Sequence, residues 1–327
     1  MDVITPLTRR SLLAKAGGVR VEIGAGVDRR DWSLLILLSV LWGGSFFFSG
    51  VAVKDLPPLT IVLARVALAA AVLTPVMWAS GARFPSSVAG WRPFFVMAVL
   101  NNVIPFSLIV VGQTMIASGL ASVLNATTPL FTVLVMAVFA EEALNVRRVA
   151  GAILGLIGVI ILRGQLAQTS SEQTAGILLC LGAALSYGFA GLWGRRKLSG
   201  IPPLTSATCQ LLCSSAVMLG LAAIVDWPRG LHMPAAATWW SLLGLAVFST
   251  ALAYVIFFQI LIRSGASIVM LVTLLIPVTA ILLGHLVLDE VLSGREIVGA
   301  LVIGSALIVM DGRLFTLFQN RRFGRRS

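Results

Sequence analysis

The stretch WGGSFFFSGVAVKDLPPLT, from Trp42 to Thr60, has an altered second copy 145 residues later, YGFAGLWGRRKLSGIPPLT, from Tyr187 to Thr205. Farther along, a shift of 148 residues superimposes residues of the same type: Trp91 on Trp239, Pro129 on Pro277, Glu142 on Glu290, Arg147 on Arg295, Gly151 on Gly299 and Gly164 on Gly312. Similarity that persists over this length indicates that the second half of the chain duplicates the first.

Both copies consist mainly of apolar residues. Hydrophobic residues make up 58% of the 327-residue chain, charged residues make up 11%, and the mean hydropathy is +0.99. Soluble domains carry about 25% charged residues, so this composition is typical of an integral membrane protein. A bilayer core about 30 Å thick is crossed by about 20 apolar helical residues, and runs of that length recur with short joints.

The chain is therefore predicted to be an all-α membrane protein with ten transmembrane helices. The predicted spans are Trp32–Val53, Pro58–Ser80, Gly90–Gly112, Ile116–Phe139, Arg147–Arg163, Thr174–Gly194, Pro203–Val225, Ala237–Ile262, Gly265–Leu288 and Arg295–Met310. They divide into a first copy, 32–164, and a second copy, 174–312, between basic tails 1–31 and 313–327. Because each copy has five spans, the second enters the membrane in the opposite direction, which is an arrangement found in transporters.

Basic residues indicate how the chain is oriented. The net charge is +11, and with both termini in the cytoplasm nineteen of the 24 Lys and Arg residues lie on the cytoplasmic side, against four outside. Cytoplasmic loops of membrane proteins carry such an excess. The charge is thereby explained without nucleic acid, and both tails are expected to contact anionic lipid. The motif TRRSLLAKAGG (Thr8–Gly18) resembles an export signal, but Lys15, Arg20 and Glu22 interrupt the apolar stretch that such a signal needs.

Several motifs resemble those of one family. AEEALN (Ala140–Asn145) is echoed by LDEVLS (Leu288–Ser293), and NNVIPF (Asn101–Phe106), GQTMIASGLASVLNATTPLFT (Gly112–Thr132) and SGASIVMLVTLLIPV (Ser264–Val278) are more specific. Over residues 32–312 the chain resembles the EamA branch of the drug/metabolite transporter superfamily. The resemblance implies a ten-helix inverted repeat that encloses a central cavity. It also implies export of amino acids and related metabolites, as by the aromatic amino-acid exporters.

Polar and aromatic side chains recur near the middle of the predicted spans. Polar groups are costly in hydrocarbon, so they are expected to face the bundle interior or a water-filled cavity. The predicted substrate-binding residues are Trp42, Arg65, Asn101, Asn102, Phe106, Gln113, Asn125, Tyr187, Thr250 and Tyr254. Asn102, Phe106 and Gln113 share one helical face, and Ser118, Ser122, Asn125, Pro129 and Thr132 share another. The alternative is that these side chains form hydrogen bonds that hold neighbouring helices together.

Matched glycines and prolines are predicted hinges: Gly43 with Gly188, and Pro129 with Pro277. They break helices and provide flexing points, although kinks fixed by packing are an equal alternative. Arg65 is the one charge well inside a predicted span. It is predicted to bind a substrate carboxylate, or else to reach the membrane surface or cap a neighbouring helix.

The sequence also disfavours other classes of protein. Its two histidines, His232 and His285, stand in no metal-binding or nucleophile motif, so neither an enzyme nor a metal or cofactor site is expected. Acidic residues are absent from the middle of the spans, and Glu141, Glu142, Asp289 and Glu290 lie at helix ends. Transport without a built-in proton site is therefore predicted, in the bacterial inner membrane, by a monomer or a homodimer. A multidrug exporter of cations and a channel-like pore are the alternatives.

Overall fold

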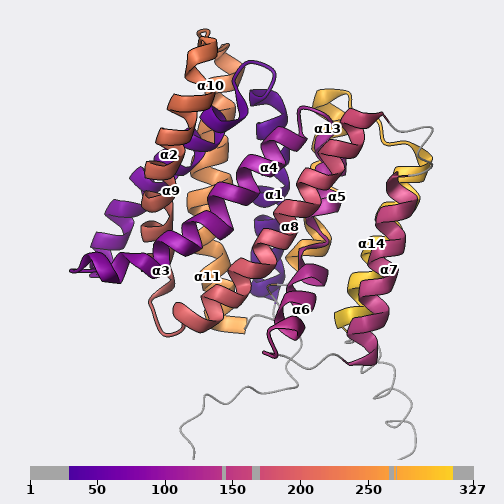
Figure 1. Ribbon diagram of the computed structural model, residues 1–327, viewed down its shortest axis with the longest axis horizontal. Coiled ribbons are helices and arrows are strands. Elements are labelled where there is room, and N and C mark those ends of the chain that lie inside the picture. The colour runs from indigo at the N-terminus through magenta and orange to yellow at the C-terminus, as the bar shows by residue number, and fades with distance from the viewer. Residues whose placement is uncertain (1–28, 142–144, 164–169, 265–268, 270, 312–327) are drawn as a thin grey trace, which may run out of the picture.

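The computed structural model describes residues 29–141, 145–163, 170–264, 269 and 271–311, and every regular element in them is helical (Figure 1). The first copy contains α1 (Arg29–Ala52), α2 (Pro58–Ala79), α3 (Val88–Ala98), η1 (Val99–Val103), α4 (Ile104–Gly112), α5 (Ser118–Asn125), α6 (Thr128–Val138) and α7 (Val146–Arg163). The second contains α8 (Ser171–Lys197), α9 (Pro203–Val225), η3 (Trp227–Arg229), α10 (Ala236–Leu243), η4 (Gly244–Leu252), α11 (Ala253–Ser264), α13 (Val272–Leu288) and α14 (Gly294–Asp311).

Within the described residues, seven helical stretches are long and apolar enough to cross a membrane, and α13 is a shorter apolar helix. The helices α7 and α14 have 18 residues each, but three charged residues lie near the ends of each one. The uncharged, apolar part of each of these two helices is therefore shorter than 18 residues. The all-helical membrane fold is thus confirmed, whereas the count of ten crossings stays a prediction. The two predicted tails lie almost wholly outside the described residues.

Three predicted spans are interrupted in the structure. Pro129 is the second residue of α6, directly after the break between α5 and α6. The spans that contain Asn101 and Thr250 instead change from α- to π-helix at η1 and η4. By contrast, α1, α8 and α13 are continuous, so the breaks predicted at Gly43, Gly188 and Pro277 are absent from these helices.

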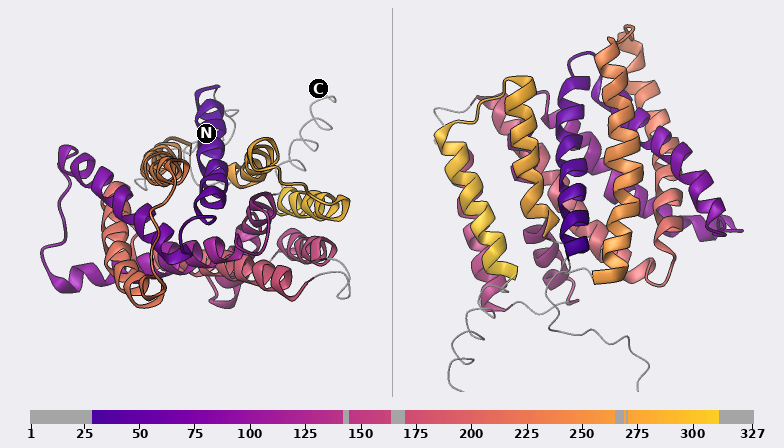
Figure 2. Two further views of the ribbon diagram at one scale, coloured as in Figure 1. Left: turned by 90° about the horizontal axis from the view of Figure 1, so that it is seen from above. Right: turned by 180° about the vertical axis from the view of Figure 1, so that it is seen from behind.

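The two copies run in opposite directions through the bundle. We call the end where α1 begins and α14 ends the terminal end, and the opposite end the distal end. In Figure 1, α1 runs from the terminal to the distal end, whereas α8 begins at the distal end. The duplicated helices α7 and α14 lie side by side at one edge of the bundle in both views of Figure 2.

Glycines let the duplicated helices approach closely in matching ways. A Cβ on Gly151 of α7 would lie 2.9 Å from Cβ of Met310, and one on Gly299 of α14 would lie 2.6 Å from Cβ of Leu162. Both the glycines and their partners are related by the 148-residue shift. The repeat in the sequence is therefore also a repeat in the packing, and this is the small-residue contact that brings membrane helices together.

Two large apolar clusters form the core. One includes Leu38 of α1, Leu124 of α5, Ala183 of α8 and Ile276 of α13. The other includes Val66 of α2, Val110 of α4, Leu211 of α9 and Leu245 of η4. Tyr187 packs against both clusters, which places it at their junction. Helices from both copies contribute to each cluster, so the copies are interlocked rather than separate domains.

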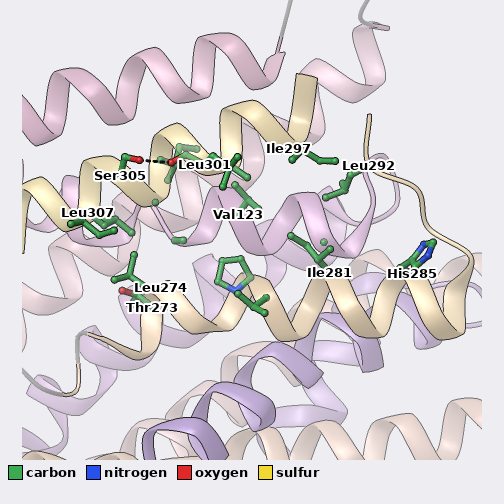
Figure 3. Close-up of a pocket in the computed structure, with 18 of the residues that line it drawn as sticks. Val123, Thr273, Leu274, Ile281, His285, Leu292, Ile297, Leu301, Ser305 and Leu307 are labelled. Atoms are coloured by element: carbon green, nitrogen blue, oxygen red, sulfur yellow. Dashed lines mark hydrogen bonds between the residues drawn. The ribbon is translucent and has the colours of Figure 1, made fainter. Parts of the chain in front are cut away.

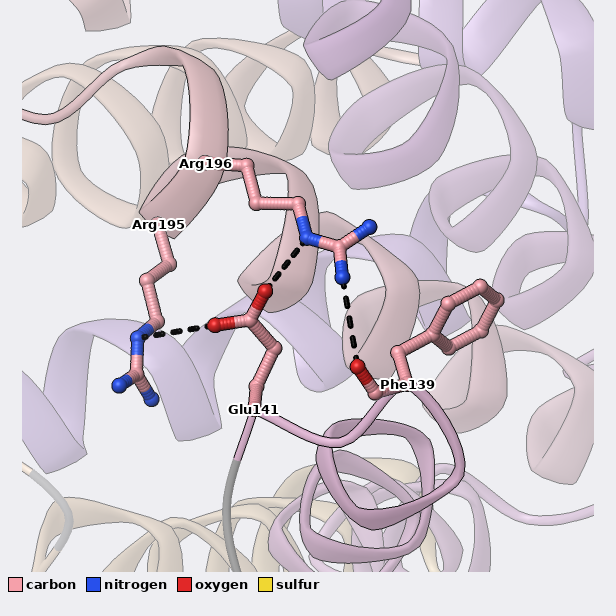
Figure 4. A network of polar contacts seen from close by, with 4 residues as sticks. All are labelled: Phe139, Glu141, Arg195 and Arg196. Carbon is pink, nitrogen blue, oxygen red and sulfur yellow. Dashed lines mark hydrogen bonds and ion pairs between the residues drawn. The ribbon is translucent and has the colours of Figure 1, made fainter.

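Helix ends are tied to the other copy at both ends of the bundle. At the terminal end, Arg196 Nε is 2.6 Å and Arg195 Nε 3.7 Å from the Glu141 carboxylate (Figure 4). At the distal end, the Asp55 carboxylate accepts hydrogen bonds from Ala235 N at 2.9 Å and Thr238 Oγ1 at 2.7 Å, at the start of α10. The Thr238 hydroxyl and then the Ala235 N–H hold the pKa of Asp55 below its ordinary value.

Acid is expected to remove the contribution of Asp55 to stability. Because the folded-state pKa is lowered, this contribution is present above about pH 4 and is lost as the pH falls through the lowered pKa. Thermal unfolding in detergent should separate wild type from Asp55→Ala at pH 7, and the separation should shrink near pH 3. An equal separation at both pH values would show that the carboxylate charge has no part in it.

Candidate functional site

Polar side chains of η1, α9 and α11 meet near the middle of the bundle. Asn102 on η1 is completely buried, and its Nδ2 donates to Ser214 Oγ on α9 at 2.9 Å. Its Oδ1 accepts a hydrogen bond from Tyr254 OH on α11 at 3.1 Å. The Ser214 hydroxyl in turn donates to Gln210 O at 2.7 Å. Both the Nδ2 and the Oδ1 of Asn102 therefore have hydrogen-bond partners. A buried polar group that is satisfied in this way holds its neighbours in position.

Asn101, the next residue, is only partly buried. Its Nδ2 lies 3.1 Å from Gln210 Oε1, 3.4 Å from Asn102 Oδ1 and 3.5 Å from Tyr254 OH. Within the described part of the chain its Oδ1 accepts no hydrogen bond, and it is not an enclosed atom. Asn101 thus contributes an acceptor that a ligand can use, while Gln210 orients the other side of the amide.

Arg65 on α2 lies in the same region with a relative exposure of 7%. Its Nε donates to Thr250 Oγ1 on η4 at 2.9 Å, and the Thr250 hydroxyl donates to Leu245 O at 2.8 Å. The guanidinium carbon is 3.7 Å from the centre of the Phe106 ring, which is a cation–π contact. Apolar packing and one hydroxyl therefore determine the direction in which the guanidinium points.

The rest of the guanidinium is unpaired. Among the described residues its two terminal nitrogens donate no hydrogen bond, and no carboxylate lies within ion-pair distance. The buried side-chain atoms that lack a hydrogen-bond partner include neither of these nitrogens, so both keep some exposed surface. Two N–H-bearing nitrogens thus remain accessible, and a guanidinium presents them in the geometry that a carboxylate accepts in pairs.

Aromatic side chains lie around this polar cluster. Tyr187 of α8 and Tyr254 of α11 are close enough to Arg65 for electrostatic interaction with it. Trp42 of α1 packs its ring 5.5 Å from that of Phe257, measured between centroids. All three are only partly buried, although Trp42 and Tyr187 lie near the middle of their helices and Tyr254 directly follows η4. An apolar group that enters the cluster can therefore contact aromatic rings.

The two π-helical segments are related by the duplication. A shift of 148 residues maps η1 onto the middle of η4, Asn102 onto Thr250 and Phe106 onto Tyr254, and the shift of 145 maps Arg65 onto Gln210. Arg65 contacts Thr250, and its counterpart Gln210 contacts Asn101, the neighbour of the residue that corresponds to Thr250. π-Helical turns are frequent at functional sites, and here both present the central polar residues.

Sequence reasoning did not propose Gln210 or Ser214 as site residues. The repeat could have identified Gln210, because the residue aligned with Arg65 is expected to contact the equivalent helix of the other copy. Ser249, the counterpart of Asn101, is also buried in η4, and its Oγ has no partner among the described residues.

Two predicted site residues form no hydrogen bond with this cluster among the described residues. Gln113 follows α4 near the distal end, where its Nε2 donates to Phe46 O at 2.8 Å and Ser118 Oγ at 3.0 Å. Asn125 ends α5, and its buried Oδ1 has no partner among the described residues. In the stripe that contains Asn125, the hydroxyls of Ser122 and Thr132 donate to carbonyls one turn earlier on the same helix.

The predicted hinge glycines are sites of close approach. A Cβ on Gly43 of α1 would lie 2.6 Å from Thr279 Cβ and 2.9 Å from Ile276 O on α13. A Cβ on Gly188 of α8 would lie 3.2 Å from the Phe131 carbonyl on α6. Phe131 and Thr279 are themselves repeat partners. Each glycine therefore forms the equivalent contact with the other copy, against the helix that carries Pro277 or Pro129.

A separate cavity of about 660 Å³ lies among α5, α13 and α14 (Figure 3). Apolar residues such as Val123, Ile281 and Leu301 line most of it, and Leu301 is 67% exposed. Because its walls include the outer surface of these helices, the cavity is a groove that faces lipid in a membrane. Its lining includes none of the central polar residues, so we place the functional site at the polar cluster.

Comparison with known proteins gives consistent matches over most of the chain. The sequence profile of the EamA-like transporter family matches residues 32–164 and 174–310. The uncharacterized transporter YoaV of Bacillus subtilis is 26% identical over 271 residues, which are 82% of this chain and 92% of YoaV. A probable amino-acid metabolite efflux pump of Escherichia coli is 25% identical over 297 residues, 86% of this chain and 95% of the pump. A crystal structure at 18% identity, with a TM-score of 0.61 over 85% of this chain and 96% of that one, has the same fold.

Proposed function

The chain belongs to the EamA-like transporter family, and from this premise we propose that it exports amino acids and related metabolites by alternating access of its two copies. Family and relatives are transporters, so the protein moves a small molecule across the membrane rather than transforming it. The proposed substrates are amino acids, including aromatic and other apolar ones.

The observation that carries this proposal is the accessible part of Arg65. A cation in the middle of a membrane bundle is costly unless it is paired, and Arg65 has no carboxylate partner among the described residues. A substrate carboxylate is the group that would complete it, through two parallel N–H···O bonds. The site would thus gain its missing charge partner when substrate binds.

The amide and aromatic groups suit the rest of an amino acid. Asn101 Oδ1 is an acceptor for a substrate ammonium group, and Tyr187 and Tyr254 add hydroxyls and ring faces. Trp42 is positioned to contact an apolar side chain. Substrate sites of this kind combine a mainly apolar lining with a few placed polar groups.

Two alternatives predict different behaviour. An exporter of lipophilic cations needs an anionic site, and Arg65 would repel such a cargo. A channel-like pore needs no saturable site. Orientation with both termini in the cytoplasm, a location in the inner membrane and movement without a proton site are part of the proposal, and they rest on the distribution of basic and acidic residues in the sequence.

Proteoliposomes that contain the purified protein should take up labelled amino acids in a saturable manner, and unlabelled amino acid on the far side should stimulate uptake. Asn101→Ala and Trp42→Ala should each raise the substrate concentration for half-maximal uptake, because each removes a contact with substrate. Gln113→Ala, a polar change outside the cluster, is the matched control. Uptake that rises linearly with concentration would favour a pore, and uptake of quaternary cations alone would favour a cation exporter.

A further inference from the structure

Three carboxylates at the distal end each bind the start of a helix that belongs to the other copy. Asp55 of the first copy binds Ala235 N and Thr238 Oγ1 beside α10. Asp226 of the second copy accepts hydrogen bonds from Thr60 N at 2.7 Å and Thr60 Oγ1 at 3.0 Å on α2. Glu290 of the second copy accepts from Ser118 N at 2.9 Å and Gly119 N at 3.2 Å on α5.

The chemistry of these three contacts makes them strong hydrogen bonds. Each joins an ionised carboxylate to N–H or O–H donors, and charge-assisted hydrogen bonds are about twice as strong as neutral ones. Each carboxylate also lies at the positive end of a helix dipole. Asp226 is only 2% exposed, so water does not readily replace its partners.

The terminal end lacks counterparts of the two aspartates. The 145-residue shift maps Asp55 onto Gly200 and Asp226 onto Gly81, and it maps Thr60 onto Thr205. Neither terminal-end loop, 80–87 or 198–202, contains an acidic residue. In these two loops the duplication has therefore kept the position while placing the aspartates at the distal end only. Glu142, the counterpart of Glu290, lies outside the described residues.

The ion pairs that the structure describes at the terminal end are more exposed than Asp226 is. Arg196 and Arg195, which contact Glu141, have 41% and 49% of their side-chain surface exposed. Arg263 is 38% exposed, and its Nε is 3.5 Å from Asp31 Oδ1. Exposed ion pairs contribute little to stability.

We infer that Asp55, Asp226 and Glu290 form a distal latch, which keeps the distal end closed in the carrier without substrate. All three contacts join a loop of one copy to a helix of the other, so any movement that separates these loops from the helices they bind must break them. The polar cluster is then reached first from the terminal end. This inference rests on the proposed alternating access, and with the termini in the cytoplasm it describes a carrier that rests ready to load a cytoplasmic substrate.

Distances between paired spin labels test the latch. In a background with Cys180, Cys209 and Cys213 replaced by alanine, one pair is placed at the distal end, Thr114→Cys with Leu231→Cys. A second pair, Arg83→Cys with Ser199→Cys, is placed at the terminal end. All four positions are exposed loop residues, and each pair joins the two copies. Distances are measured by pulsed electron paramagnetic resonance in lipid nanodiscs without substrate.

The carrier with an intact latch should give one short distal distance. The double variant Asp55→Ala with Asp226→Ala should add a longer distal distance whose population rises at least several-fold, and should shorten the terminal distance. Glu172→Ala, which removes an exposed carboxylate from the start of α8 at the same end, is the matched control and should resemble wild type.

An unchanged distal distance in the folded double variant would overturn the latch. If the double variant loses its helical circular dichroism, the single variant Asp55→Ala, which changes an exposed side chain, is judged by the same criterion. The distances need no substrate, so a failed latch leaves the proteoliposome result intact. Conversely, absent amino-acid transport in wild type would defeat the proposed function without changing the distances.

Discussion

Replacing Arg65 by glutamine will lower the transport of amino acids roughly 10- to 100-fold, because a hydrogen bond to a charged group contributes about 1.5–3 kcal/mol. The change removes the charge that faces the polar cluster and makes position 65 the same as its repeat partner, Gln210. Initial rates of uptake into proteoliposomes, measured over a range of substrate concentrations, give the ratio directly.

Arg83→Gln is the matched control, because it removes the same charge from an exposed loop and should leave the rates unchanged. Arg65→Lys keeps the charge but loses the planar pair of donors, so intermediate rates are expected. The amine that remains when the carboxylate is removed from a transported amino acid should be a poor substrate for wild type. Equal transport of that amine, or full activity of Arg65→Gln, would refute the role of Arg65.

Substituting alanine for Gly43 will destabilise the protein by about 1–3 kcal/mol, the usual cost of overpacking. The new Cβ would lie 2.6 Å from Thr279 Cβ and 2.9 Å from a backbone carbonyl, so α1 must move away from α13. The thermal unfolding midpoint in detergent, read from the loss of helical circular dichroism, measures the effect.

Gly44, the next residue, provides an internal control. A Cβ there would lie 3.7 Å from the Phe48 ring, which is ordinary van der Waals contact. Gly44→Ala should therefore keep the wild-type midpoint, or raise it slightly, because alanine favours a helix more than glycine does. Equal midpoints for Gly43→Ala and wild type would show that the contact between α1 and α13 yields easily, and would favour a flexible hinge at this position.

The candidate site illustrates what helical spacing can and cannot predict. Asn102, Phe106 and Gln113 share a face by periodicity, and the structure places Asn102 and Phe106 at the central cluster. Gln113 is 11 residues beyond Asn102, which is about 16 Å along a helix, so it lies at a different depth. A common face does not mean a common site, because a ligand spans only a turn or two.

Other contacts in the cluster depend on helix geometry that periodicity does not describe. The π-helical turns of η1 and η4 change the register of the residues that follow them. Gln210 and Ser214 bind the two amides only because α9 lies against η1 at this depth. The same applies to Gly43 and Gly188, where the sequence indicates small residues but not the helices that approach them.

Composition and the internal repeat are enough to establish that this chain is a duplicated, helical membrane protein. Apolar runs of about 20 residues cross lipid as helices, because a helix satisfies all of its backbone hydrogen bonds within the segment. The 148-residue repeat is visible when the sequence is aligned with itself. The packing of the helices determines that Thr250 and Phe106 direct Arg65, and that carboxylates at the distal end bind helices of the opposite copy. Each of these contacts joins different helices or loops that lie far apart in the sequence, so no local pattern predicts them.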